Sequence, residues 1–202
     1  MAVHGGPDII TDGLVLSLDA ADKNSYPGSG TTWTDLSGNG NNFTMDSAAA
    51  WNSDGTMTLA DAYGYTYSGT ITTSSSSTCV FWMYTTDVQS VFWHKQDGAG
   101  NYMGAYRVGN KEYYYLVGSP DFRMDTVAQS NIYDNIRDGN WHMIEFKNCD
   151  FSGGTWTGFL FNQYASFQFS NGKLASMLIY NRDLTAAEST QNFNAQRSRF
   201  SV

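Results

Sequence analysis

The chain has 202 residues, of which 41% are hydrophobic, 15% aromatic and 15% charged. This length predicts one domain with a full core, and the composition excludes an intrinsically disordered chain. The formal charge is −8, and the 11 Lys and Arg are spread singly, which argues against nucleic acid as a partner. No apolar stretch approaches the length of a membrane span, so no membrane partner is expected either.

Period-two alternation first occurs from Gly13 to Ala20, where Leu14, Leu16 and Leu18 are expected to face a core. We predict an N-terminal arm over residues 1–12 and a single domain over residues 13–202. Clusters of Gly, Asn, Asp and Ser bound eight further predicted strands: Thr78–Tyr84, Ser90–His94, Asn101–Val108, Lys111–Val117, Trp141–Lys147, Thr155–Phe161, Ala165–Phe169 and Lys173–Tyr180. Many short strands at this spacing indicate an all-β, antiparallel β-sandwich.

One short helix is predicted near the C-terminus. The segment Thr185-Ala-Ala-Glu188 matches a capping box, with Thr185 as the N-cap and Glu188 reaching back to it. The helix is expected to run to about Gln196.

Two long segments resemble a known family. The first is Gly13-Leu-Val-Leu-Ser-Leu-Asp-Ala20 with Trp33-Thr-Asp-Leu-Ser-Gly-Asn-Gly-Asn-Asn42, and the second is Gly172-Lys-Leu-Ala-Ser-Met-Leu-Ile-Tyr-Asn-Arg-Asp-Leu-Thr-Ala-Ala-Glu188. Both resemble the laminin-G-like, concanavalin A-like lectin and glucanase jelly-roll family. Val80–Met83 and Asp138–His142 resemble its central strands in the expected order. The resemblance implies a concanavalin A-like jelly roll with a short C-terminal helix.

The chain also resembles the short stand-alone members of this family found among tailed-phage virion proteins, which begin near the first strand without a signal peptide. This resemblance implies a non-enzymatic virion structural protein, made in the host cytoplasm, that decorates the capsid or belongs to the tail. Its expected partners are capsid or tail proteins and further copies of itself, and cell-surface glycans are a further candidate. The alternatives are a free carbohydrate-binding module of a bacterial protein and, as the weakest, a glycoside hydrolase.

Catalysis is not expected, because retaining glycosidases need two carboxylates about 5 Å apart. The three glutamates, Glu112, Glu145 and Glu188, have no acidic residue two or four positions away. Glu145 is interpreted as a surface-facing strand residue and Glu188 as a helix cap. The three histidines are far apart, no nucleophile motif is present, and the two cysteines, Cys79 and Cys149, are interpreted as buried thiols.

Two groups of residues are candidates for binding. Five tyrosines crowd one predicted hairpin: Tyr102, Tyr106, Tyr113, Tyr114 and Tyr115. Four of them, Tyr102, Tyr106, Tyr113 and Tyr115, are the candidates for either a glycan-binding surface or, as we favour, a contact with a subunit or capsid.

The second group consists of Asp35, Asn39 and Asn41, whose side-chain oxygens suit calcium, an ion that the resembled family often binds at an edge of the sandwich. A structural loop, pinned to the core by Trp33 and Leu36, is the interpretation we favour. No cofactor is expected, and calcium is the one ion worth testing.

Overall fold

The computed structural model describes residues 7–47, 50–60, 65–67, 71, 74–86, 90–97, 102–108, 111–115, 118–130, 133–150, 156–161 and 171–202. The described strands are β1 (Leu14–Asp19), β2 (Thr32–Trp33), β3 (Phe43–Met45), β4 (Trp51–Asn52), β5 (Thr56–Leu59), β6 (Tyr65–Tyr67), β7 (Ser77–Thr85), β8 (Ser90–Asp97), β9 (Tyr102–Val108), β10 (Lys111–Tyr115), β11 (Gly118–Met124), β12 (Val127–Ala128), β13 (Trp141–Cys149), β14 (Trp156–Phe161) and β15 (Gly172–Tyr180). The described helices are α1 (Tyr133–Ile136), α2 (Ala186–Gln196) and the 3-10 helix η2 (Arg197–Arg199).

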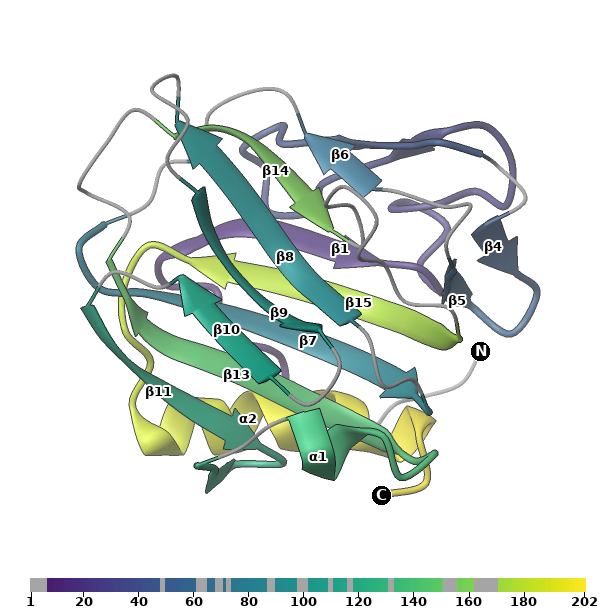
Figure 1. The fold of residues 1–202 in the computed structure, drawn as a ribbon. Helices are drawn as coiled ribbons and strands as arrows, with labels where there is room; N and C mark the ends of the chain where they lie inside the picture. Colours follow the sequence, from purple (N-terminus) through teal and green to yellow (C-terminus); the bar gives the residue numbers. More distant parts are fainter. Residues whose placement is uncertain are drawn as a thin grey trace.

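These strands form two antiparallel sheets that face each other (Figure 1). One sheet has eight strands in the order β12-β11-β13-β7-β15-β5-β4, with β1 paired to β15 beside this row. The other has seven strands in the order β10-β9-β8-β14-β6-β3-β2. The predicted all-β sandwich with a C-terminal helix is therefore confirmed.

The main core lies between the two sheets. Trp33, Phe43 and Tyr65 enter it from the seven-stranded sheet, and Phe81 and Phe146 enter it from the eight-stranded sheet, all fully buried. The rings of Phe81 and Phe146 meet edge to face at 6.0 Å. Both buried cysteines belong to this core as free thiols, which confirms their interpretation.

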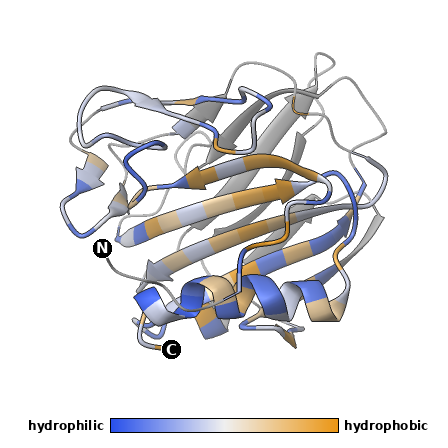
Figure 2. Cartoon of the chain, turned by 180° about the vertical axis from the view of Figure 1, so that it is seen from behind, coloured by the Kyte–Doolittle hydropathy of each residue, from blue (hydrophilic) through white to orange (hydrophobic). Residues whose placement is uncertain are grey.

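A second apolar layer covers the outer face of the eight-stranded sheet. There α2 and η2 lie across the strands, and Trp82 stacks on Phe193 at 5.6 Å and on Phe200 at 4.4 Å. Figure 2 shows apolar residues along this sheet and a mixed pattern along the helix. The buried positions of α2 are polar: Ser189, Asn192 and Gln196.

The capping box predicted for this helix is confirmed. Thr185 Oγ1 accepts from Glu188 N at 3.3 Å, and Glu188 Oε2 accepts from Thr185 N at 2.8 Å. Arg182 adds an ion pair to Glu188 Oε1 at 2.6 Å. Helix α2 ends at Gln196, where the prediction placed its end.

The described part of the N-terminal arm is tied to this helix layer. Ile10 N donates to Asn192 Oδ1, and Tyr180 Oη donates to Ile10 O, both at 2.9 Å. Gln191 Nε2 donates to Asp8 O at 2.8 Å. These contacts hold residues 8–10 along α2.

Eight of the nine predicted strands overlap strands of the structure, and the ninth, Ala165–Phe169, lies outside the described residues. The prediction for Leu14 is wrong. A bulge between Leu14 and Leu16 shifts the register against β15, so Leu14 packs in the outer layer while Leu16 and Leu18 face the main core. Strands β2–β6, β11 and β12 were not predicted, and most of them are only two to four residues long.

Candidate functional site

The structure brings Asp35, Asn39 and Asn41 together along the free edge of β1. Asn39 Nδ2 donates to Leu14 O at 3.3 Å, and Asn41 Nδ2 donates to Val15 O at 2.7 Å. Ser17 N donates to Asp35 Oδ1 at 2.9 Å. The loop thus occupies the hydrogen-bonding groups that a neighbouring strand would use, which protects this edge from pairing with another chain.

The Asp35 carboxylate is almost fully buried and accepts four hydrogen bonds from the chain. Its Oδ1 accepts from Ser17 N and Ser37 N, and its Oδ2 accepts from Ser37 Oγ and Asn41 N, at 2.7–3.0 Å. Among the described residues, no group of three His, Cys, Asp or Glu side chains is arranged to hold a metal ion. Calcium at this loop remains a prediction, and it would have to compete with these donors.

The four candidate tyrosines lie on β9 and β10, the two strands at one end of the seven-stranded sheet. Tyr113 is paired with Tyr106, and Tyr115 is paired with Gly104. Tyr102 is paired with Gln96 of β8. Their side chains are outside the described part of the structure, so their role in glycan binding or in an interface remains a prediction.

Leu36 and Glu145 differ from their predictions. Leu36 does not pin its loop to the core, because its side chain is 39% exposed, whereas Trp33 is fully buried. Glu145 is not surface-facing: α2 covers its face of β13, and its exposed fraction is 0%. Neither carboxylate oxygen of Glu145 has a hydrogen-bond partner among the described residues.

His142 is held between two aspartates, Asp125 and Asp138. Its Nδ1 lies 2.6 Å from Asp125 Oδ2, and its Nε2 lies 3.1 Å from Asp138 Oδ1. Burial lowers the pKa of His142, but the hydrogen bonds to the two aspartates raise it more, so the pKa stays above 6.5. Both ring nitrogens are therefore within hydrogen-bond distance of a carboxylate, and the side chain connects two turns at one end of the sandwich.

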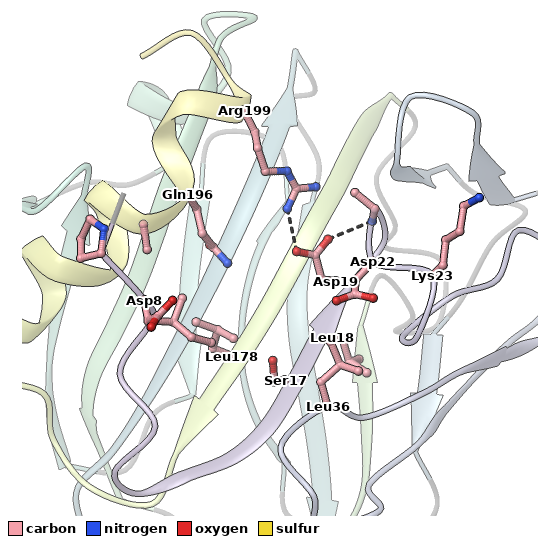
Figure 3. Close-up of a pocket in the computed structure, with 14 residues that line it drawn as sticks. Asp8, Ser17, Leu18, Asp19, Asp22, Lys23, Leu36, Leu178, Gln196 and Arg199 are labelled. Carbon is pink, nitrogen blue, oxygen red and sulfur yellow. Dashed lines mark hydrogen bonds and ion pairs between the residues drawn. The ribbon is translucent and has the colours of Figure 1, made fainter. Parts of the chain in front are cut away.

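A groove of about 600 Å³ lies beside the end of β1. Its walls come from the turn that follows Asp19, from the last turn of α2, from η2 and from the N-terminal segment at Asp8. Figure 3 shows Asp8 and Gln196 on one side and Asp19, Asp22 and Lys23 on the other. Neighbouring apolar groups form the floor: Ile9, Leu36 and Leu178.

An ion pair closes one end of the groove. Arg199 Nη1 lies 2.7 Å from Asp19 Oδ2, and Asp19 Oδ1 accepts from Ala21 N at 2.8 Å. Both ionic side chains are largely buried, with 19% and 24% of their surfaces exposed. This pair fixes the C-terminal segment against the end of β1.

Several polar groups in the groove remain available to a ligand. Gln196 Oε1 accepts from Ser176 Oγ at 3.2 Å, and no described residue accepts from its amide nitrogen, which points into the groove in Figure 3. Among the described residues, Asp8, Asp22 and Lys23 have no ion-pair partner. The groove therefore presents donors and acceptors above a small apolar floor, a combination typical of sites for polar small molecules.

Sequence reasoning did not identify this groove. Its polar residues come from the arm, from the turn after β1 and from the end of α2, and they form no local motif. The contact between Asp19 and Arg199 joins residues 180 positions apart. The two segments that resemble the family do supply part of its lining, with Asp19 and Leu36 from the first and Leu178 from the second.

No protein-family model matches the chain, and no curated protein is similar to it in sequence. Several solved structures are similar in fold. Domain 4 of an extracellular arabinanase from Geobacillus stearothermophilus, solved in complex with arabinotriose, is 15% identical with a TM-score of 0.52, and the match covers 90% of this chain and 98% of that domain. The binding domain of botulinum neurotoxin serotype D is 13% identical with a TM-score of 0.50, covering 93% of this chain and 52% of that one.

A mutant of the Trypanosoma rangeli sialidase that displays trans-sialidase activity is also similar, at 12% identity and a TM-score of 0.57, over 96% of this chain. The chain spans about a third of the length of the sialidase chains it matches. At these identities the likeness shows the fold alone. It agrees with the lectin-like β-sandwich that the sequence predicts.

Proposed function

We propose that this domain binds a neutral carbohydrate in the groove beside β1. The groove itself supports the proposal, because the Gln196 amide, the Lys23 ammonium and the Asp8 and Asp22 carboxylates surround an apolar floor. Sugar hydroxyls both donate and accept hydrogen bonds, so they match this mixture better than a ligand that can only donate or only accept. The arabinanase domain, solved with arabinotriose, is a fold neighbour consistent with this use.

The charges of the groove favour neutral sugars over acidic ones. Arg199 is neutralised by Asp19, which leaves two carboxylates without ion-pair partners among the described residues against the single ammonium of Lys23. An anionic sugar would meet net negative charge there. We therefore expect neutral glycans to bind better than their sialylated forms.

A glycan array with and without calcium tests the proposal, followed by calorimetry on the best neutral glycan. Asp22→Asn keeps the Oδ1 that accepts from Asn24 N but removes the charge, and Lys23→Gln removes the ammonium. Each change is expected to weaken binding about tenfold, the effect of losing a hydrogen bond to a charged group. Thr190→Ala, on the exposed side of α2, is the matched control and should bind like the parent protein. A silent array, or unchanged affinity in both groove variants, would overturn the proposal.

We further propose that the domain is not itself a catalyst. Two of the three glutamates support this, because Glu145 is buried beneath α2 and the Glu188 carboxylate already accepts hydrogen bonds from Thr185 and Arg182. The third, Glu112, lies on β10. Turnover of β-glucans or arabinans by the purified domain that is lost in Glu145→Gln would contradict this.

The virion role remains a proposal founded on resemblance alone. A capsid-decoration or tail-associated protein that displays this domain is compatible with glycan binding, since such a protein would present the groove to cell-surface sugars. Mass spectrometry of purified phage particles, together with the genes on either side of the coding region, tests this role. A strictly monomeric protein encoded far from virion genes would contradict it.

A further inference from the structure

The groove continues around the turn that follows β1. One adjoining hollow of about 320 Å³ shares Arg199 with the groove and is also lined by Trp141 and Phe200. Another, of about 250 Å³, shares Ala21 and Lys23 with the groove. Because these wall residues are shared, the two smaller hollows adjoin the groove on either side of the turn.

The hollow that shares Lys23 contains an aromatic face, which the groove lacks. Its wall includes Trp51, whose side chain is partly exposed and whose indole Nε1 donates to Ala20 O at 2.9 Å. The Trp51 ring also lies 5.8 Å from the ring of Tyr26, at an angle of 47°. The hydrogen bond and the ring contact fix the orientation of the indole before any ligand arrives, which lowers the entropy cost of binding.

Polar groups flank this aromatic face. Lys23 lies between the groove and the hollow, and Asp54 lines the hollow while paired with Lys173 at 2.6 Å. An aromatic ring packs against the C–H face of a sugar, and charged groups beside it bind the hydroxyls. The hollow therefore complements the groove: one offers a stacking surface, the other offers hydrogen bonds.

We infer that the ligand is an oligosaccharide, with one sugar unit in the groove beside Asp22 and Gln196 and a neighbouring unit stacked on Trp51. Lys23 lies at the junction and contacts both units. This inference rests on the proposed carbohydrate-binding function and adds the length of the ligand and a second subsite.

Calorimetry with sugars of increasing length tests the inference. The probes are arabinose, arabinobiose and arabinotriose, with glucose, cellobiose and cellotriose as a second series. Affinity for the trisaccharide of the preferred series is expected to exceed that for its monosaccharide at least about tenfold, because a second linked contact adds avidity. Trp51→Phe has a smaller ring and lacks the hydrogen bond that orients the indole, so it should reduce this gain and leave monosaccharide affinity within about twofold, since the groove is unchanged.

Trp141→Phe is the matched control, because it makes the same change in the other hollow and should keep the gain with length. Asp54→Asn, at an exposed position that lines this hollow but not the groove, is a second variant that should reduce the gain with length if circular dichroism shows that Trp51→Phe is misfolded. Binding that is independent of length would overturn the second subsite but leave the proposed function intact, as would a gain that is undiminished in Trp51→Phe. Binding of neither series, together with a silent glycan array, would overturn the proposed function itself.

Discussion

The buried Glu145 provides the most direct test of the structure. It lies on β13 beneath α2 with an exposed fraction of 0%, and neither of its oxygens has a hydrogen-bond partner among the described residues. The buried hydroxyl of Ser189 beside it is likewise without one. Burial raises the pKa of Glu145, and the nearby positive charges of Lys147 and Arg123 offset only part of that rise.

A raised pKa in the folded state makes the stability depend on pH in a definite direction. Below about pH 4.5 the carboxyl is protonated in both the folded and the unfolded chain, so its ionisation does not lower the free energy of unfolding. As the pH rises through the folded pKa, the folded protein must bury a charge that the unfolded chain hydrates. The parent protein therefore loses stability across this window.

Glu145→Gln removes the ionisation while keeping the size and shape of the side chain. At pH 4 we expect the free energy of unfolding to be nearly unchanged. At pH 8.5 we expect the variant to be more stable, by about 1.4 kcal/mol for each unit by which the folded pKa lies above that of the unfolded chain. Dividing the difference between these two values by about 1.4 kcal/mol gives the shift of the pKa in units.

Urea unfolding, monitored by tryptophan fluorescence at pH values from 4 to 8.5, measures this difference. The comparison requires that the free energy of unfolding has the same slope against urea concentration in both proteins. Subtracting the parent protein removes the contributions of all other titrating groups. Glu188→Gln is the matched control, because the same substitution at an ion-paired glutamate should destabilise at neutral pH. A Glu145→Gln variant that is no more stable than the parent at pH 8.5 would refute the burial of an unpaired carboxylate.

Three further predictions concern other described groups. Because the pKa of His142 is raised in the folded state, the stability that this side chain contributes should be full below about pH 6.5 and lost at higher pH. His142→Gln should therefore lower the free energy of unfolding in urea by about 1–3 kcal/mol at pH 6 and by less at pH 9. The ion pair with Arg182 and the backbone bond from Thr185 lower the pKa of Glu188 to about 2, so Glu188→Gln should cost about 1 kcal/mol at pH 7 and progressively less from about pH 4.5 to 2. Because chain donors already bind the Asp35 carboxylate, we expect the thermal midpoint to stay the same when calcium is added or chelated. A calcium-dependent rise that disappears in Asp35→Asn would instead support a metal site there.

Local sequence patterns predicted most of the longer regular elements, although the seven-residue β11 was missed. The alternation in Leu16–Leu18 and the capping box at Thr185 depend on residues within a few positions of each other, and both were located correctly. Strands of two to four residues, such as β2 and β4, contain too few positions to show alternation. The loop at Asp35 was correctly identified as a unit, but its hydrogen bonding to the edge of β1 required the partner strand to be seen.

The sequence by itself determined the class of fold, the capped C-terminal helix and the net negative charge, because composition, periodicity and capping can be read without the tertiary structure. Only the tertiary structure decided which side chains are buried and which meet. Glu145 alternates like a surface residue but is covered by α2, and the bulge in β1 moves Leu14 to the other face. The groove exists because folding brings Asp19 against Arg199, 180 residues away, and no local pattern encodes a contact between positions so far apart.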